Sequence, residues 1–278
     1  MQSRKKTIDT IIYIALIILA VAFMVPIALV LMNSFKNKLY INTTPFVLPN
    51  SESFVGFRNY IEGLTKIKFI NSIGYSVFIT VFSVIVIIIC CSMASWFITR
   101  VKTKTTSFLY FLFVGSMVVP FQMVMYTMTK TANVLHIDNY VGIIILYLGF
   151  GSAQAVFMFS GFVKGIPMEL EEAALIDGCN PLGMFFRVIF PVLKPISITV
   201  AILDAMWIWN DFQLPYLIIG TKYRTVPVAI QYLKSGYGSI DYGHLMAVIV
   251  VALIPIIIFY FSCQKYIIEG IVDGAVKG

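Results

Sequence analysis

Long apolar runs, separated by short polar segments, make up most of the 278 residues. A helix needs about 20 apolar residues to cross about 30 Å of hydrocarbon, and six of the runs reach that length. The predicted spans cover residues 10–32, 71–98, 107–128, 140–163, 196–219 and 243–264. Proline inside a run predicts a kink, as at Pro26, Pro120 and Pro255. The pattern therefore predicts an all-α polytopic membrane protein with six transmembrane helices.

The order of the spans predicts one transmembrane domain over residues 1–278. Its first helix, 10–32, exceeds the roughly 7–15-residue apolar core of a signal peptide, so we expect it to be kept as an anchoring helix. Residues 71–266 are expected to form the core of the domain. They include one large polar loop, 164–195, between the fourth and fifth spans.

Composition supports the membrane interpretation and excludes other classes. The chain is 59% hydrophobic and 12% charged, against about 25% charged in ordinary soluble domains. A soluble enzyme, a nucleic-acid-binding protein and a secreted disulfide scaffold are therefore excluded. The net charge of +7, from 20 basic and 13 acidic residues, is attributed to basic loops at the membrane surface.

Basic residues also predict the orientation. Arg4, Lys5 and Lys6 precede the first span, and a second basic group follows the next span, at Arg100, Lys102 and Lys104. Cytoplasmic loops are enriched in Lys and Arg, so both groups are expected inside the cell. An even number of spans then places both termini in the cytoplasm and the chain in the cell membrane.

The loop 164–195 is predicted to fold as two short helices. Pro167 is suited to the first turn of a helix, and three glutamates follow at 169, 171 and 172, where the helix dipole favours negative charge. Gly178 is placed to end this helix with a positive φ. Asn180-Pro181 then signals a second helix start.

The second helix carries an apolar stripe that Pro191 and Pro195 are expected to end. Its members repeat at helical spacing: Leu182, Phe185, Phe186 and Ile189. If the stripe is exposed on the inner face, it favours a docking surface for a protein. The alternative is an interfacial helix resting on lipid headgroups, although such helices are typically rich in Lys and Arg, and this loop is acidic.

The same loop resembles the EAA loop of ABC importer permeases. The match consists of Glu172-Ala173-Ala174, three residues, Gly178, nine residues, Val188, one residue and Phe190-Pro191. Val188 and Phe190 depart from the family's Ile and Leu but remain apolar. The resemblance implies the type I ABC importer permease fold, in which this loop forms coupling helices that sit in a cleft of a cytoplasmic ATPase. The coupling residues implied are Glu172, Ala173, Ala174, Asp177, Gly178, Phe185 and Pro191.

Two further segments are similar to the carbohydrate-uptake permeases, in particular the maltose-type second permease subunit. These are Trp209-Asn210-Asp211-Phe212 and the tail, Gln264-Lys265-Tyr266 with Gly270 and Gly274 to Gly278. Glu269, Val272 and Asp273 depart from the commoner tail residues. The resemblance implies a heterodimer with a homologous permease subunit, two ATPase subunits on the cytoplasmic side and an extracytoplasmic sugar-binding protein, with no nucleic acid.

Motifs for catalysis, nucleotides and metals do not appear in the sequence. The chain has no Gly-Lys dipeptide, so a phosphate loop of the Walker type is excluded. Its two histidines, His136 and His244, are far apart, and its four cysteines are interpreted as small apolar residues. We therefore expect a non-catalytic subunit without cofactor or metal, with ATP bound by partner ATPase subunits.

The fifth predicted span contains ionisable residues, which are costly in a bilayer and usually face protein or water. Asp204, Trp207 and Asp211 fall at i, i+3 and i+7 and share one helix face. An indole between carboxylates suits a sugar, which stacks on the ring and donates hydrogen bonds to the carboxylates. Asn210 points about 100° away from Asp211, and we expect it to line the pore or to contact a neighbouring helix. The alternative is that the aspartates pair with polar groups of neighbouring helices and Trp207 only packs.

Two alternative functions remain at this point. One is a permease of the same fold for a solute other than a sugar. The other is a proton-coupled secondary transporter that uses Asp204 as its proton carrier. Inverted repeats with broken helices would be expected in a transporter of that kind, and the sequence shows none. A small-residue group, Gly149-x-Gly151-Ser152, is interpreted as a close helix contact.

Overall fold

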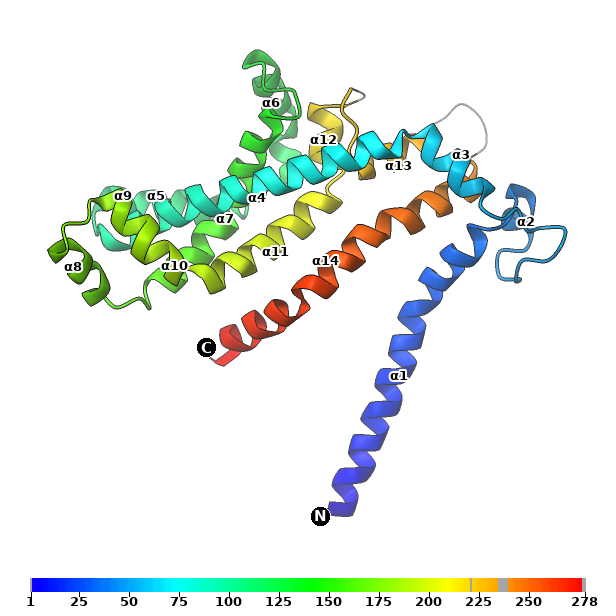
Figure 1. Cartoon of the computed structure of the whole chain (residues 1–278), viewed down its shortest axis with the longest axis horizontal. Helices are drawn as coiled ribbons and strands as arrows, with labels where there is room; N and C mark the ends of the chain where they lie inside the picture. The colour runs from blue at the N-terminus through cyan, green and yellow to red at the C-terminus, as the bar shows by residue number, and fades with distance from the viewer. Residues whose placement is uncertain (1, 221, 235–239, 277–278) are drawn as a thin grey trace. The chain divides into compact units, whose positions relative to one another are not determined.

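The structure is a computed structural model that describes the backbone of residues 2–220, 222–234 and 240–276. Side chains are described for residues 9–220, 222–233 and 240–266. Within these ranges the chain is helical, and the one β-type pairing is an isolated bridge between Lys36 and Phe54 (Figure 1). The helical part of the predicted fold class is therefore confirmed.

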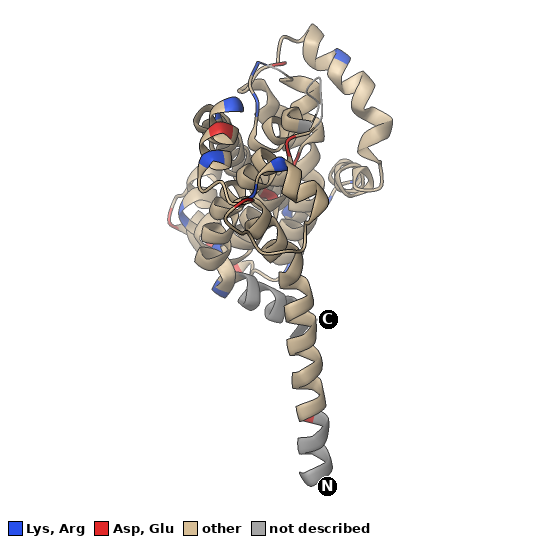
Figure 2. Ribbon diagram, turned by 90° about the vertical axis from the view of Figure 1, so that its right-hand side faces the viewer, with Lys and Arg blue, Asp and Glu red and all other residues tan. Residues whose placement is uncertain are grey.

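Two compact units make up the chain. The first, unit 1, combines Met1–Phe69 with Ala229–Pro255, and the second, unit 2, combines Ile70–Val228 with Ile256–Gly278. In both units the long helices carry few charged residues, which gather at helix ends and in connecting segments (Figure 2).

Unit 1 contains α1 (Gln2–Asn33), α2 (Lys38–Thr43), α3 (Arg58–Lys66) and the first part of α14 (Tyr242–Val276). The 25-residue apolar segment of α1 has none of its most hydrophobic window buried within the chain. Its aliphatic side chains therefore need lipid or another protein to cover them. Ile67, Ala229 and Val248 form the small buried apolar cluster of this unit.

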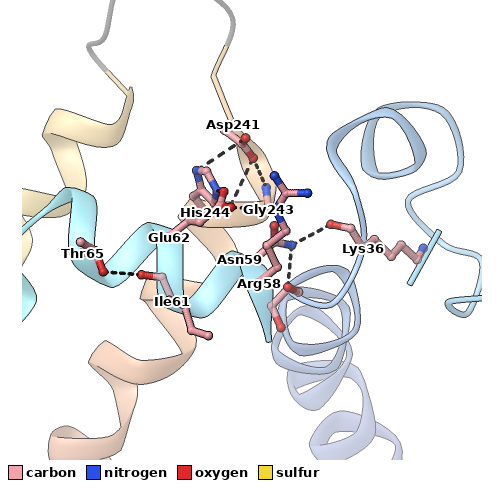
Figure 3. A network of polar contacts seen from close by, with 10 residues as sticks. Lys36, Arg58, Asn59, Ile61, Glu62, Thr65, Asp241, Gly243 and His244 are labelled. Carbon is pink, nitrogen blue, oxygen red and sulfur yellow. Dashed lines mark hydrogen bonds and ion pairs between the residues drawn. The ribbon is translucent and has the colours of Figure 1, made fainter. Parts of the chain in front are cut away.

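Polar contacts hold the segment 34–57 of unit 1, which connects α1 to α3, to the neighbouring helices (Figure 3). Asn59 is buried and donates through Nδ2 to the backbone oxygens of Ser34 and Lys36, both at 2.8 Å. Lys36 is itself only 1% exposed, and its Nζ donates to the carbonyl of Thr44 at 3.0 Å. Burial removes water from this ammonium group and lowers the pKa of Lys36.

A short chain of ionisable groups crosses the same unit. Glu62 accepts a hydrogen bond from Arg58 at 2.7 Å and lies 3.0 Å from Nε2 of His244. His244 Nδ1 in turn lies 3.5 Å from a carboxylate oxygen of Asp241. Gly243 passes so close to Asn59 that an added Cβ would lie 2.7 Å from its Nδ2. Residues from opposite ends of the sequence therefore meet here through polar groups.

Unit 2 is built around α7 (Gly142–Val163), which contributes many of the fully buried side chains, among them Tyr147, Val156 and Phe159. The helix contacts α5 (Lys104–Ser116) and α11 (Lys194–Asn210). It also meets α4 (Phe69–Arg100), where Ser95 donates to the carbonyl of Val156 at 3.3 Å. Gly151 permits this approach, because an added Cβ would lie 2.7 Å from Cδ1 of Ile87. A Cβ added at Gly149 would meet no heavy atom within 4 Å, so of the two glycines in the predicted small-residue contact only Gly151 makes a close approach.

Shorter helices complete unit 2. They are α6 (Phe121–Val134), α8 (Glu169–Ile176), α9 (Pro181–Met184), the π-helical turn η1 (Phe185–Ile189), α10 (Phe190–Val192) and α12 (Gln213–Ile218), followed by α13 (Val226–Lys234), which passes into unit 1. Val226 is tied back to α4, because its backbone N–H donates to Oγ of Ser76 at 2.9 Å.

Four described helices are long and apolar enough to cross a membrane: α1, α4, α7 and α14. The number rises to six if each of two bent helix pairs counts as one span. The chain bends by 108° between α5 and α6, just before Pro120, where the sequence predicted a kink. A further bend of 77° separates the segment Pro181–Val192 from α11.

The prediction of one continuous helix over 196–219 is wrong. α11 ends at Asn210, Asp211 is extended with ψ 125°, and α12 begins at Gln213. Pro215 accounts for the break, because its ring would clash with the carbonyl four residues earlier, at Asp211. The Asp211 side chain then accepts the first free N–H groups of α12, from Gln213 at 2.9 Å and Leu214 at 3.4 Å.

Candidate functional site

The acidic helix α8 lies in the loop that the sequence singled out. Its first turn contains Glu169, Glu171 and Glu172, and its two sides differ in burial. Glu171 and Ala174 are buried, at 6% and 5% exposure, whereas Glu172 and Ala173 are exposed. Because of the helical spacing, one side of α8 packs against the rest of the chain and the other side is exposed.

Arg100 anchors the packed side. Its Nε lies 2.6 Å from Oε1 of Glu171, and its Nη2 donates to the carbonyl of Ile166 at 2.8 Å. Both side chains of the ion pair are largely buried, at 14% and 8% exposure. Because Arg100 is the last residue of α4, the pair joins the end of a long apolar helix to the start of α8. Sequence reasoning used Arg100 only as a marker of orientation and missed this contact.

Gly178 ends the first helix as predicted. Its φ is +77°, which confirms the expected left-handed conformation. The turn is closed by hydrogen bonds from Gly178 N to Leu175 O and from Cys179 N to Ala174 O, both 3.0 Å long. An added Cβ would meet no heavy atom within 4 Å, so backbone conformation alone makes this position favour glycine. Asp177, just before it, is exposed.

The second helix begins where it was predicted, since Asn180 accepts a hydrogen bond from the backbone of Gly183 at 2.6 Å. The prediction of an exposed apolar stripe is wrong for two of its four members. Phe185 and Ile189 are fully buried, whereas Leu182 and Phe186 are 60% and 47% exposed.

The π-helical turn accounts for part of this difference, because η1 changes the angular spacing on which the stripe was based. The ring of Phe185 packs 5.7 Å from that of Trp96 on α4, with Phe186 and Phe190 on its other sides. Phe185 therefore positions the loop from inside. Pro191 is exposed in the short helix α10, before the bend that leads into α11.

Part of the loop is left exposed by the described residues of the chain. We call it the open face, defined by Glu172, Ala173, Leu175, Ile176, Asp177 and Leu182, all of which are exposed. Ile176 is 87% exposed, which is unusual for an isoleucine held in a regular helix. Carboxylates and large apolar side chains lie together on this face, a composition that suits contact with another protein.

The residues of α11 are placed by their contacts with α7. Asp204 is 2% exposed, and within the described part of the chain its Oδ2 has no hydrogen-bond partner. It faces Gly151, where an added Cβ would lie 3.7 Å from Oδ1. A buried carboxylate without a donor is costly, so this position is set apart from ordinary packing.

Tyr147 brings the other two residues of the predicted face together. Its hydroxyl lies 3.0 Å from Oδ2 of Asp211, and its ring meets that of Trp207 edge-on at 5.5 Å. Trp207 remains 42% exposed, so one part of the indole is free. Asn210 instead donates to the carbonyl of Met206 at 2.7 Å, within its own helix. Tyr147 was missed by the sequence analysis, because a tyrosine in an apolar run carries no distinguishing signal.

Two remaining predictions concern the tail and metal sites. The tail beyond Tyr266 lies outside the residues whose side chains are described, and Lys277 and Gly278 lie outside the described backbone. Among the described residues, no group of three or more His, Cys, Asp or Glu side chains is arranged to hold a metal ion.

Relatives of the chain include two permeases that cover nearly its whole length. A probable starch degradation products transport system permease protein of Thermoanaerobacterium thermosulfurigenes is 38% identical over 94% of both chains. The multiple sugar-binding transport system permease protein of Streptococcus mutans serotype c is 35% identical, over 95% of this chain and 96% of its own.

A solved structure shares the fold. It is the crystal structure of a bacterial ABC transporter involved in the import of the acidic polysaccharide alginate. One of its chains superposes with a TM-score of 0.79 and 21% identity, covering 94% of this chain and 96% of its own. Residues 92–272, which include α7, α8 and α11, match the family model for the inner membrane component of binding-protein-dependent transport systems. The chain therefore belongs to the family of binding-protein-dependent transport system inner membrane components.

Proposed function

We propose that this chain is a permease subunit of an ATP-driven ABC importer and forms half of the translocation pathway for a sugar or oligosaccharide. Support comes from the family and from relatives that are named as permeases for starch degradation products and multiple sugars. The other half is formed by a homologous permease subunit. An extracytoplasmic binding protein delivers the solute, and two ATPase subunits on the cytoplasmic side bind ATP, so this subunit needs no cofactor of its own.

The proposed topology has six spans in one transmembrane domain, with both termini in the cytoplasm. The four long apolar helices each provide one span, and the bent pairs α5–α6 and the α9–α10 segment with α11 provide the others. The basic residues at the N-terminus and at the end of α4 support this orientation. The loop 164–195 then faces the ATPase subunits.

Coupling is assigned to α8 and the turn that follows it. The single observation that carries this assignment is that the helix is buried on one side and exposed on the other: Arg100 holds Glu171 on the buried side, while the open face is exposed. Glu172, Ala173 and Asp177 would contact the ATPase. Ala174, Gly178, Phe185 and Pro191 would fix the angle of the helix. Movement of the ATPase is then transmitted through Glu171 and Arg100 to α4.

Substrate contact is assigned to the face of α11 around Tyr147. Trp207 offers a partly exposed ring on which a pyranose can stack, and the carboxylate of Asp211 can accept hydrogen bonds from its hydroxyls. Asn210 borders this face. Asp204 lies deeper, and we assign it to the pathway because its buried carboxylate has no donor among the described residues.

Substitution at Gly178 tests the proposed coupling. A Cβ at φ +77° costs about 1–2 kcal/mol and tilts the turn that ends α8. Gly178→Val should leave the permease inserted, reduce co-purification of the ATPase with tagged permease and lower sugar uptake by the same cells. Glu172→Ala should show a milder form of the same defect. Gly161→Val is the control, since it adds the same side chain at a helical glycine with open space around it.

Two outcomes would contradict the proposal. Normal ATPase co-purification and normal uptake in Gly178→Val would show that this loop does not couple. Uptake that continues without the partner ATPase but stops when the proton gradient is collapsed would indicate a secondary transporter. Uptake of a solute other than a sugar by the intact complex would support the proposed permease function but show that its substrate is not a sugar.

A further inference from the structure

A cavity of about 510 Å³ opens in unit 2, where the ends of α4 and α7 meet the start of α5. We call it the basic pocket. Its lining consists of Ile98, Thr99, Arg100, Lys102, Ser107, Tyr110, Ser160 and Lys164. The volume lies in the range of about 300–1,000 Å³ that is typical of ligand sites. Three of the eight lining residues are cationic, and none is acidic.

The two lysines supply the charge of this pocket. Arg100 is already neutralised by Glu171, which does not line the cavity. Within the described part of the chain, neither Lys102 nor Lys164 has a carboxylate within ion-pair distance. Lys164 lies over the ring of Tyr110, with Nζ 5.7 Å from the ring centre, which holds the ammonium group at the pocket wall. A free anion that enters would meet two uncompensated positive charges.

Hydroxyl groups provide the second, independent observation. Thr99, Ser107, Tyr110 and Ser160 all line the pocket. Ser160 is 1% exposed, and its Oγ has no hydrogen-bond partner among the described residues. Oγ1 of Thr99 is also buried without a partner there. Buried polar atoms are nearly always paired, so a pair of unsatisfied hydroxyls beside two cations indicates a missing acceptor.

The chemistry of the lining favours a phosphate group. Two ammonium groups and four hydroxyls offer more donors than the two oxygens of a carboxylate can use, whereas a phosphate presents several acceptor oxygens. Lysine is also a common point-charge partner for phosphate. We propose that the basic pocket binds the phosphate group of an anionic ligand, with Lys102 and Lys164 supplying charge and Ser160 and Thr99 supplying hydrogen bonds.

Two sources of such a phosphate are compatible with the position of the pocket. Arg100 is the last residue of α4 and Lys164 is the C-cap of α7, so the pocket lies where two apolar helices end. This is the depth at which lipid headgroups meet protein, and basic pockets between transmembrane helices bind anionic headgroups. Lys102 and Ser107 are exposed, so a soluble phosphate ester can also enter.

Occupancy has a route to α8 through Arg100. The recorded hydrogen bonds of this side chain use Nε and Nη2, toward Glu171 and Ile166, while the same residue lines the pocket. An anion in the pocket would therefore share Arg100 with the residue that anchors α8. We accordingly expect binding in the pocket to alter the ATPase rate of the assembled complex as well as its ligand content.

The test uses the complex with its partner subunits, purified in detergent and analysed by native mass spectrometry. The probes are phosphatidylglycerol, phosphatidylcholine and, in a lipid-depleted sample, glycerol 3-phosphate. The test variant is Lys102→Gln with Lys164→Gln. The matched control, Lys104→Gln with Lys194→Gln, removes two exposed charges from residues that do not line the pocket. A third variant, Ser160→Ala, removes one buried hydroxyl.

If the basic pocket binds phosphate, binding should be selective for anionic phosphate-bearing ligands and should depend on Lys102 and Lys164. The wild type and the control should bind phosphatidylglycerol or glycerol 3-phosphate at about one molecule per permease, and the double lysine variant should bind it about tenfold more weakly. Ser160→Ala should weaken binding by a smaller factor. Preference for phosphatidylglycerol identifies a lipid, and saturable binding of glycerol 3-phosphate without lipid identifies a soluble ester. Equal retention of both lipids together with no bound glycerol 3-phosphate, or equal weakening in the test and control variants, would overturn the proposal.

Discussion

The two units differ in the size of their buried apolar clusters. Unit 1 has a small buried apolar cluster of three residues and several buried polar groups, including Lys36, Asn59 and Ser34. Unit 2 has a large buried apolar cluster that runs through α4, α7 and α11, and its buried polar groups include serines of α4 and the largely buried ion pair of Arg100 with Glu171. In unit 1 the segment 34–57 is held mainly by hydrogen bonds to a few side chains, whereas the helices of unit 2 also pack around an extensive apolar cluster.

The comparison explains where each unit is vulnerable. Apolar packing distributes its free energy over many contacts, so the loss of one buried methyl group typically costs only about 1 kcal/mol. A buried donor that satisfies two backbone carbonyls has no substitute nearby, and its removal leaves both acceptors unpaired. Within unit 2, α8 is held to the packed core by the ion pair of Arg100 and Glu171. Four predictions test this division, in order of decreasing effect.

Breaking the ion pair of unit 2 should have the largest effect. Arg100→Leu leaves the carboxylate of Glu171 buried without a partner, which costs about 3–5 kcal/mol. The thermal unfolding midpoint of the purified permease should fall clearly. The double variant Arg100→Leu with Glu171→Leu should recover much of the loss, since no charge is then stranded. Arg187→Leu, at an exposed position of the same loop, is the control. Equal losses in the single and double variants would show that the charge pair is not what matters.

Removing the central donor of unit 1 should have the next effect. Asn59→Ala deprives the carbonyls of Ser34 and Lys36 of their donor, at an expected cost of about 2–3 kcal/mol. Protease sensitivity of the segment 34–59 should rise together with the fall in unfolding midpoint. Asn133→Ala removes an exposed amide that donates to Asp138, and it should change neither quantity. Unchanged protease sensitivity in Asn59→Ala would show that the hydrogen bonds of Asn59 do not hold the segment 34–57 in place.

A third prediction compares two glycines of α7 that lie two residues apart. Gly151→Val forces a side chain against Ile87 and should destabilise the permease by about 1–2 kcal/mol. Gly149→Val meets open space and should not destabilise the permease, because valine has a higher helix propensity than glycine. Unfolding midpoints of the two variants, measured side by side, isolate the packing contribution. Equal midpoints would mean that the contact between α4 and α7 is looser than the structure has it.

The smallest predicted effect is a pH dependence in unit 1. Hydrogen bonds from Arg58 and His244 lower the pKa of Glu62 from its ordinary value of 4.5. The folded state therefore releases this proton more readily than the unfolded state does. The resulting stabilisation is present above the unfolded pKa and is lost as the pH falls through the lower folded pKa. Between about pH 6 and pH 3, the unfolding midpoint of the wild type should fall more steeply than that of Glu62→Gln. If the unfolding midpoints of the wild type and of Glu62→Gln changed in parallel with pH, the contacts of Glu62 would not stabilise the fold.

Local signals in the sequence correctly predicted several backbone features. Gly178 has the positive φ expected of a helix end, Asn180 caps the next helix, and the chain breaks before Pro120. Each of these features depends on interactions among residues a few positions apart, which the sequence displays directly. Pro215 carried a signal of the same kind for the break after Asn210, but the apolar run obscured it, because hydropathy does not register a missing N–H.

Contacts between distant residues required the tertiary structure. The sequence determined that α1 and α7 are apolar helices, but their composition could not show that α7 is buried within the chain and α1 is not. It determined a spacing for Phe185, but packing against Trp96 placed the ring inside. Arg100 meets Glu171 across 71 positions, and Tyr147 meets Asp211 across 64. Hydrophobic burial has no direction of its own, so only the packed arrangement of the helices decides which polar groups come together.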